Sequence, residues 1–411
     1  MEIPKEWPTE VSNIYSPIRV LGKGGFASVV LARDKNDSKT KVAVKVVGSS
    51  SEDVGNVEAE KKTAAYAQRE IEILRRLDHE NIVKVINYWD LLEGKEDRPK
   101  NNAICVIALS YAKGPTVESL LQHGGALSNV FGRVVLAQVV DTVAYMHYRG
   151  VLHRDIKPDN IMITGAVSKD DEIWDNEDPS SKSKNWDEKR GKWKVTLIDF
   201  GFARALKEKD IINPSKEIHQ ENKRASFRNL DDSAKTESTN EDTNESSSRG
   251  RGTLGNRNFA APEIINKVKH ATSEEKEGGI SSVTETISEY VADYGLLVDS
   301  YSMGHTIRYC MTGVMPGESV EAAISTQNSF CFKLCGGNKK DQGKRSVHYR
   351  LTSELSEELQ DLIKNLTEVS EKKRVSIRKA RRSSPWINDV LLGVKSEEQE
   401  HFLSEKSYLE F

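Results

Sequence analysis

The pattern of apolar residues changes near Gly114, and this change constrains the fold more than any other feature of the chain. Before it, residues 15–47 and 80–111 are rich in β-branched residues bounded by turn residues, which predicts antiparallel strands. Between them, residues 64–77 carry apolar side chains at helical spacing. After Gly114, residues 130–150 predict a long apolar helix that ends at a glycine, and further helical segments follow. The sequence therefore predicts an α+β fold, with a small β-rich part and a larger α-rich part.

The composition argues against several other classes of protein. Lys and Arg number 60 against 63 Asp and Glu, so the net charge of -3 gives no electrostatic reason to expect a nucleic-acid or membrane partner. The longest apolar stretch, residues 103–109, is too short to span a bilayer, and residues 1–10 lack the apolar core of a signal peptide. We therefore expect a cytoplasmic or nuclear protein. Its four cysteines are irregularly spaced, which favours reduced structural thiols.

Two polar segments interrupt this pattern, and we predict disordered insertions at residues 165–193 and 207–252. Both are charged and rich in Ser, Thr and Asn, so they have little apolar surface to bury. The acidic run "DDEIWDNED" lacks the central glycine and the ligand spacing of a calcium loop. A solvated charge run is the simpler interpretation.

A glycine-rich loop near the N-terminus is the first candidate for phosphate binding. Gly22 and Gly24, in "GKGGFASV", allow backbone amides to lie close to phosphate oxygens. By itself the loop equally fits an ordinary β-hairpin. Lys45, in "VAVK", follows on a predicted strand, where a cation among apolar neighbours needs an anionic partner. That partner is either a phosphate or a carboxylate, and Glu70 is the candidate carboxylate.

Three further motifs follow in a fixed order: "HRDIKPDN" at 153–160, "DFG" at 199–201 and "APE" at 261–263. Together with the glycine loop and the strand lysine, they match the signature set of protein kinases. The chain resembles a eukaryotic protein kinase of the serine/threonine type over about residues 14–390. The resemblance implies a two-lobed protein-kinase-like fold.

The lobe boundaries follow from the same resemblance. We place an N-lobe at 14–109 and a C-lobe at 110–390, between an N-terminal extension at 1–13 and a C-terminal tail at 391–411. In the tail, Tyr408 and Phe411 resemble the hydrophobic motif of cyclic-nucleotide-dependent kinases, although a frayed terminus is the simpler expectation.

The resemblance also implies catalytic roles, because phosphoryl transfer needs positioning and charge neutralisation more than covalent chemistry. Asp155 would accept or orient the proton of the substrate hydroxyl, and Lys157 would neutralise the γ-phosphate. Lys45, paired with Glu70, would anchor the α- and β-phosphates.

The implied cofactors are ATP and Mg2+. The metal ligands would be Asn160 and Asp199, through hard oxygen atoms. The residues implied for ATP binding are Gly22, Lys23, Gly24, Gly25, Phe26, Val29, Ala43, Lys45, Leu109, Tyr111, Ala112 and Met162. Leu109 would be the gatekeeper, and the backbone of residues 110–112 would be the hinge.

Other matched residues are expected to build the scaffold. The apolar spine of the family maps onto Leu74, Val85, His153 and Phe200, so we interpret His153 as a packing residue rather than a proton shuttle. Glu263 and Arg374 resemble a buried ion pair, and Asp299 resembles the anchor beneath the catalytic loop. The basic run at 372–382 is interpreted as a solvated helix rather than a nuclear import signal.

Departures from the family pattern leave every catalytic residue in place. Ala27 stands at the third glycine position, and Asn256 replaces a threonine that neighbours the catalytic residues, but its amide can still form hydrogen bonds. Ser110 replaces a common acidic hinge residue, and Tyr301 replaces a tryptophan. Neither of these two positions takes part in phosphate chemistry.

Specificity and regulation are implied by the remaining positions. Lys157, two positions after Asp155, favours serine or threonine acceptors, and Asp159 suggests arginine in the substrate. Arg154 would clamp a phosphorylated activation segment, within which Ser226 is one candidate for an upstream kinase. We therefore expect a protein serine/threonine kinase acting on protein substrates. The alternatives are a pseudokinase or ATP-binding scaffold of the same fold, and a kinase of small molecules, which the "APE" segment and Arg374 disfavour.

Overall fold

The computed structural model describes residues 8–24, 27–48, 57–91, 103–165, 173–174, 186–206, 258–265, 295–323 and 348–392. Gly25, Phe26, Ser226, Asn256, Tyr408 and Phe411 lie outside the described residues, as does the predicted insertion at 207–252.

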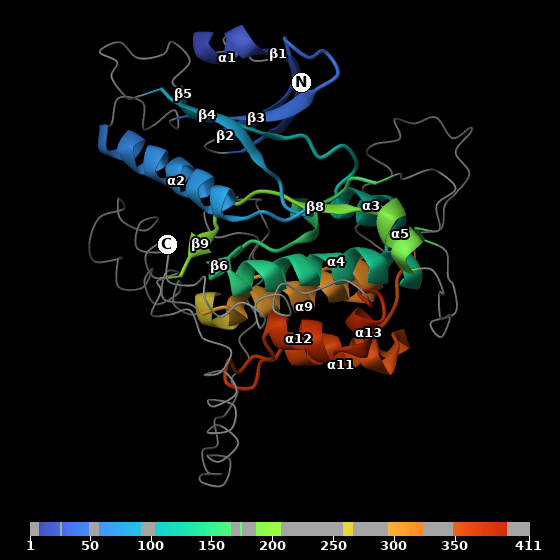
Figure 1. The fold of residues 1–411 in the computed structure, drawn as a ribbon. Coiled ribbons are helices and arrows are strands. Elements are labelled where there is room, and N and C mark those ends of the chain that lie inside the picture. The colour runs from blue at the N-terminus through green and yellow to red at the C-terminus, as the bar shows by residue number, and fades with distance from the viewer. Residues whose placement is uncertain are drawn as a thin grey trace.

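A five-stranded antiparallel sheet forms the N-lobe (Figure 1). Its strands are β1 (Tyr15–Lys23), β2 (Ala27–Asp34), β3 (Lys41–Gly48), β4 (Val85–Asp90) and β5 (Ala103–Ser110), in the order β1-β2-β3-β5-β4. Side chains alternate between the two faces, so Val42 and Val44 share one buried face while Ala43 and Lys45 lie on the other. Helix α2 (Val57–Arg76) packs near β3, β4 and β5. The predicted β-rich lobe with one main helix is confirmed.

A short helix, α1 (Thr9–Ile14), covers the outer face of this sheet (Figure 1). Val11 is fully buried in a cluster that includes Val42 and Val44, and the Tyr15 ring meets the Trp89 ring edge-on at 6.1 Å. The sequence prediction set residues 1–13 apart as an extension. From Pro8 onward, however, the chain packs on the sheet, because Val11 supplies an apolar side chain for its outer face.

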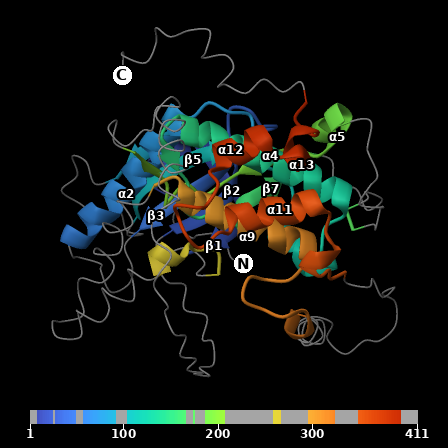
Figure 2. The same cartoon turned by 90° about the horizontal axis from the view of Figure 1, so that it is seen from below.

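The C-lobe is mainly helical, as predicted (Figures 1 and 2). Its described helices are α3 (Val117–Gly124), α4 (Asn129–Tyr148), α5 (Trp186–Lys192), α9 (Leu297–Thr312), α11 (Glu357–Leu366), α12 (Ile377–Ser383) and α13 (Pro385–Asn388). Helix α4 is the centre of the lobe and packs against α5, α9, α12 and α13. Ser128 caps it by accepting a hydrogen bond from the Phe131 amide at 3.2 Å, and the chain turns away at Gly150, whose φ is 68°.

Four short strands lie between the helical core and the N-lobe. They are β6 (Val151–Leu152), β7 (Ile161–Ile163), β8 (Val195–Leu197) and β9 (Arg204–Ala205), and they pair antiparallel as β6 with β9 and β7 with β8. Turns of 3-10 helix occupy Pro158–Asn160 and Thr352–Glu354.

The first predicted insertion is partly built into the C-lobe, so the expectation of disorder across 165–193 is wrong at its described residues. Ile173 and Trp193 are each 1% exposed, and α5 packs on α4. The segment is polar on average, but two of its described apolar side chains, Ile173 and Trp193, are each large enough to bury considerable surface.

The basic run at 372–382 also differs from the expected solvated helix. Arg374 and Arg378 are buried, and Arg381 pairs with Asp141 at 2.6 Å. The described part of the chain contains no helix that is long and apolar enough to cross a membrane. Cys105 and Cys310 are free and buried, and burial raises the pKa of Cys105 to about 12, so both are structural thiols as expected. Cys331 and Cys335 lie outside the described residues.

Candidate active site

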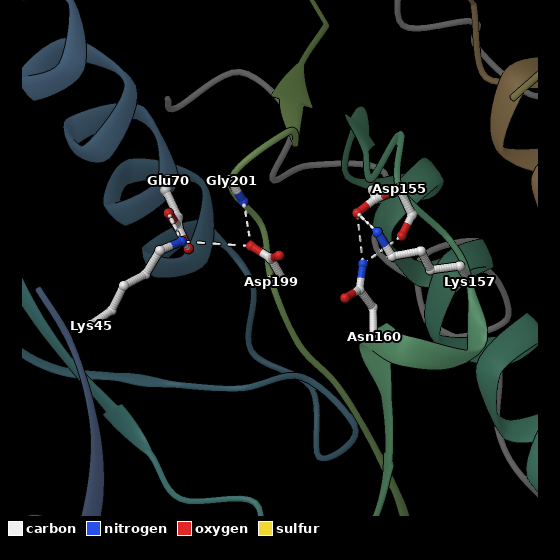
Figure 3. A network of polar contacts seen from close by, with 7 residues as sticks. All are labelled: Lys45, Glu70, Asp155, Lys157, Asn160, Asp199 and Gly201. Carbon is white, nitrogen blue, oxygen red and sulfur yellow. Dashed lines mark hydrogen bonds and ion pairs between the residues drawn. The ribbon is translucent and has the colours of Figure 1, made fainter. Parts of the chain in front are cut away.

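The candidate catalytic residues come from both lobes and meet between them (Figure 3). Strand β3 carries Lys45 and α2 carries Glu70, whereas the loop after β6 carries Asp155 and Lys157. The β7–β8 hairpin has Asn160 directly before one strand and Asp199 shortly after the other. The Ile198 amide donates to the Asn160 carbonyl at 2.9 Å, which ties the two ends of the hairpin together.

Lys45 and Glu70 form a buried ion pair. The Lys45 Nζ atom lies 2.8 Å from Glu70 Oε1 and 2.7 Å from Oε2, and their side chains are 14% and 5% exposed. Burial alone would lower the pKa of Lys45, but the charges of Glu70 and Asp199 outweigh it and raise the pKa above its usual value. Lys45 is therefore a fixed cation at neutral pH, as the sequence argument required.

Asp199 faces Lys45 from the other side of the site. Its Oδ1 atom lies 3.5 Å from Lys45 Nζ and accepts a hydrogen bond from the Gly201 amide at 3.4 Å. Desolvation would raise the pKa of this carboxyl, but the charge of Lys45 opposes it and the net effect is a lowered pKa. Asp199 is thus ionised at neutral pH.

The catalytic loop holds Asp155 in a compact network. Asp155 Oδ2 accepts hydrogen bonds from Lys157 Nζ at 2.7 Å and from Asn160 Nδ2 at 2.9 Å, and the Asp155 carbonyl accepts a second bond from Asn160 Nδ2 at 2.8 Å. Asp155 is 5% exposed. These contacts fix the orientation of a carboxylate that could accept a proton.

Asp299 on α9 holds this loop from below. Its carboxylate accepts hydrogen bonds from the backbone amides of His153 and Arg154, at 2.9 and 2.8 Å, and lies 2.9 Å from His147 Nε2. Burial alone would raise the pKa of Asp299, but the hydrogen bond and charge of His147 lower it. The sequence located Asp299 by resemblance, but it gave no signal for His147, whose partner lies far away along the chain.

The backbone is unusual at two residues of this site. Within the described ranges, Arg154 and Asp199 are the non-glycine residues with positive φ, at 65° and 61°. This left-handed conformation costs free energy in a residue with a side chain, so the surroundings must stabilise it. The Asp299 carboxylate does so at Arg154.

The two proposed metal ligands offer oxygen atoms of the right kind. The Asn160 amide nitrogen is committed to Asp155, which leaves the amide oxygen directed toward Asp199 (Figure 3). One carboxylate oxygen of Asp199 likewise points toward Asn160 (Figure 3). Among the described residues, no group of three or more His, Cys, Asp or Glu could hold a metal. An amide oxygen and a carboxylate oxygen are donors that suit Mg2+, which often takes only one or two protein ligands and completes its shell with phosphate oxygens and water.

The residues expected to contact adenine lie along the inner face of the sheet and on β7. Ala43 pairs with Leu109, and Val29 pairs with Lys45, so these side chains share one face. Leu109 is 8% exposed, and Met162, on β7, is half-buried. Tyr111 and Ala112 follow β5 and are half-buried.

The glycine loop leaves open space above its backbone. Among the described residues, a Cβ atom at Gly22 would meet no atom within 4 Å, and one at Gly24 would meet the Ala27 carbonyl oxygen at 3.5 Å. Protein packing therefore does not demand glycine at either position. The side chain of Lys23, between them, is exposed.

The expected apolar spine is packed between the lobes. Leu74, His153 and Phe200 are buried, Val85 is half-buried, and the rings of His153 and Phe200 meet edge-on at 4.9 Å. His153 is a packing residue, as expected.

The ion pair expected between Glu263 and Arg374 is present. Arg374 Nη1 lies 2.6 Å from Glu263 Oε1, and Nη2 lies 3.0 Å from Oε2. Arg374 also stacks under the Tyr301 ring, with 4.9 Å from its guanidinium carbon to the ring centroid. Tyrosine thus covers the arginine where the family pattern has tryptophan.

The fold and this constellation of residues define a protein kinase domain, and the chain belongs to the protein kinase superfamily. A sequence model of the family described as "Protein kinase domain" matches residues 15–219.

Among the curated relatives, "Probable serine/threonine-protein kinase fhkA" of Dictyostelium discoideum is 23% identical over 388 residues, covering 94% of this chain and 52% of the relative. "Serine/threonine-protein kinase RAD53" of Saccharomyces cerevisiae is 25% identical over 377 residues, covering 92% and 33%. "Serine/threonine-protein kinase cds1" of Schizosaccharomyces pombe is 25% identical over 381 residues, covering 92% and 59%. The chain thus matches only part of each of these longer proteins.

Proposed function

We propose that this chain is an ATP-dependent protein serine/threonine kinase. The observation that carries the proposal is the convergence of Lys45, Asp155, Asn160 and Asp199, from both lobes, around one site (Figure 3). The three relatives named above are serine/threonine-protein kinases by name, which supports the same activity.

Each residue has a physical task in this proposal. Asp155 accepts the proton of the substrate hydroxyl, and Lys157, 2.7 Å away, neutralises charge on the γ-phosphate. Lys45 binds the α- and β-phosphates while Glu70 holds its position. Asn160 and Asp199 would hold Mg2+, which neutralises charge on the phosphates when it is bound.

A protein rather than a small molecule is the proposed phosphate acceptor. The segment at 258–265 is anchored to α9 through the Ser302 hydroxyl, which donates to the Phe259 carbonyl at 2.8 Å, and to the loop after α11 through the pair of Glu263 with Arg374. A segment that is fixed in this way could support a bound peptide chain. Asp159 would favour arginine in that peptide, and a peptide library that shows no preference for arginine would contradict this detail.

The proposal is tested by transfer of labelled phosphate from ATP to a mixed protein substrate, followed by analysis of the modified amino acid. We expect phosphoserine and phosphothreonine. Asp155→Asn keeps the size of the side chain but removes the base, and we expect it to lower the rate by about 10²- to 10⁴-fold. Activity that survives this substitution would reveal a contaminating kinase. A chain that binds ATP without transferring phosphate in any phosphorylation state would instead be a pseudokinase or scaffold.

We also propose that phosphorylation of the segment after Asp199 raises activity. The support is a cluster of positive charge around Arg154: burial, with the nearby charges of Arg204 and Arg69, lowers the pKa of Arg154 to about 10 despite the opposing charge of Asp299. A phosphate group would relieve this repulsion through charge-assisted hydrogen bonds. Enzyme treated with phosphatase should therefore turn over more slowly than the phosphorylated enzyme. In Arg204→Gln, the turnover rates of the two forms should differ less. Full turnover after complete dephosphorylation would contradict the idea.

A further inference from the structure

The β7–β8 hairpin carries both proposed metal ligands, yet it is too short to fix them alone. Three residue pairs join its strands: Ile161 with Leu197, Met162 with Thr196, and Ile163 with Val195. An isolated two-stranded hairpin is only marginally stable in water. The position of Asn160 relative to Asp199 must therefore depend on contacts that hold the hairpin from outside.

Trp193, two residues before β8, provides such a contact at the opposite end of the hairpin. Its side chain is 1% exposed, and its ring meets the Phe131 ring on α4 edge-on, with 5.1 Å between centroids. The Trp193 carbonyl accepts a hydrogen bond from Gln138 Nε2 at 2.8 Å, and Gln138 is also on α4. Both the ring and the backbone of Trp193 are thus fixed to the central helix of the C-lobe.

The far end of β7 is joined to the same segment. The Thr164 amide donates to the Lys194 carbonyl at 2.8 Å. The Gly165 backbone approaches the Lys192 carbonyl so closely that a Cβ atom at Gly165 would lie 1.9 Å from its oxygen. A displacement of Trp193 would therefore shift β8 against β7 and change the spacing of the two ligands at the other end.

We infer that Trp193 is a positioning residue for the metal site: packed against Phe131 and Gln138, it sets the geometry in which Asn160 and Asp199 bind a divalent cation. This inference rests on the proposed function. It assigns a task to the end of the insertion at 165–193, which the sequence predicts to be disordered.

Loss of the contact between Trp193 and α4 should lower the affinity for the metal more than the affinity for the nucleotide. Mg2+ requires nearly octahedral geometry at about 2.0–2.1 Å, so a small displacement of a ligand weakens binding. Lys45 and the inner face of the sheet, which supply most of the nucleotide's other expected contacts, belong to the N-lobe. Of the residues expected at adenine, Met162 is on β7 and contributes one apolar side chain, so the nucleotide should depend much less than the metal on Trp193.

The test measures the affinity for Mn2+ by electron paramagnetic resonance in the presence of saturating ADP, and the affinity for ADP in EDTA. For Trp193→Ala we expect Mn2+ affinity to fall about tenfold, the lower end of the range for residues that orient metal ligands, with a much smaller change of ADP affinity in EDTA. Trp193→Phe, which keeps an aromatic contact with Phe131, should recover most of the affinity. If Trp193→Ala does not fold, Gln138→Leu should show a smaller loss in the same direction.

Trp186→Ala is the matched control. Trp186 lies on the same insertion, but its ring stacks with Arg133, 5.2 Å from the guanidinium carbon, and not with Phe131 or Gln138. We expect normal Mn2+ affinity in this variant. Normal Mn2+ affinity in Trp193→Ala, or an equal loss in both alanine variants, would overturn the inference. A wild-type protein that binds Mn2+ with ADP but transfers no phosphate would contradict the proposed function only, whereas one that binds no Mn2+ would contradict both.

Discussion

Single residues of this site depend on neighbours that are distant in the sequence. Asp155 is oriented by Lys157 and Asn160 from its own loop, but the loop itself is held by the Asp299 carboxylate on α9. Lys45 remains charged in a buried position because two carboxylates face it. In each case a buried polar group is stabilised by a partner that supplies a hydrogen bond or an opposite charge.

His305 on α9 lacks such a partner and gives a prediction about pH. Its Nδ1 atom is buried and makes no hydrogen bond within the described structure, and its ring packs at 4.6 Å from that of Tyr301. Burial, together with the charges of Arg308 and Arg374, lowers its pKa from 6.5 to about 4. Between these values the unfolded state binds more protons than the folded state, so the stability from neutral His305 is present above pH 6.5 and is lost as the pH falls toward 4.

We expect His305→Gln to remove this dependence. The free energy of unfolding of the wild type, relative to the variant, should fall by about 1 to 2 kcal/mol between pH 7 and pH 5, a range that allows for the partial exposure of the ring. Urea unfolding at the two pH values measures it. If wild type and variant differ in the free energy of unfolding by the same amount at both pH values, the prediction for His305 is wrong.

Motif residues of the site could be predicted from the sequence because their types and order are specific to the chemistry. Lys45, Glu70, Asp155, Asn160 and Asp199 do come together in the structure. Residues that hold these motif residues in place could not be predicted. The sequence of an apolar helix does not show whether its histidine or glutamine bonds to a residue far away along the chain. His147 and Gln138 are the examples.

At the scale of elements, Arg374 joins three parts of the C-lobe. Its side chain is fully buried and donates to Glu263, to the Leu297 carbonyl at 3.0 Å and to the carbonyls of Glu368 and Val369 at 2.7 and 3.1 Å. One guanidinium therefore links the segment at 258–265, the start of α9 and the loop after α11.

We expect Arg374→Lys to lower the free energy of unfolding by about 3 kcal/mol or more, because an ammonium group cannot make the five hydrogen bonds of this guanidinium. Arg382→Lys, at an exposed position of α12, is the matched control and should change it by less than about 0.5 kcal/mol. Chemical denaturation compares them. Equal stability of the two variants would contradict the role of Arg374 as a junction.

The elements themselves were largely predictable, and the exceptions have a common cause. The sheet, α2, α4, α9 and α11 follow from regular apolar spacing over many residues. Helices α1 and α5 did not, because both are short and lack a repeated apolar pattern: α1 packs through Val11, and α5 has no buried residue and ends directly before the buried Trp193. The average polarity of a segment does not reveal a single buried side chain of this kind.

At the scale of the whole molecule, the site exists only where the two lobes meet. Strand β3 and α2 supply Lys45 and Glu70, and the C-lobe supplies the catalytic loop and the β7–β8 hairpin (Figure 3). The contact of Asp199 with Lys45 at 3.5 Å and the packing of Phe200 between the lobes connect the two halves. We propose that the two lobes together bind one metal ion that is also bound by the phosphates of ATP.

A crystal structure with Mn2+ and a non-hydrolysable ATP analogue tests this claim most directly, because the anomalous signal of manganese locates the ion. The account predicts a peak within about 2.0–2.3 Å of both the Asn160 amide oxygen and an Asp199 carboxylate oxygen, with the analogue's phosphates facing Lys45. A nucleotide bound elsewhere, or a metal that contacts neither residue, would contradict it.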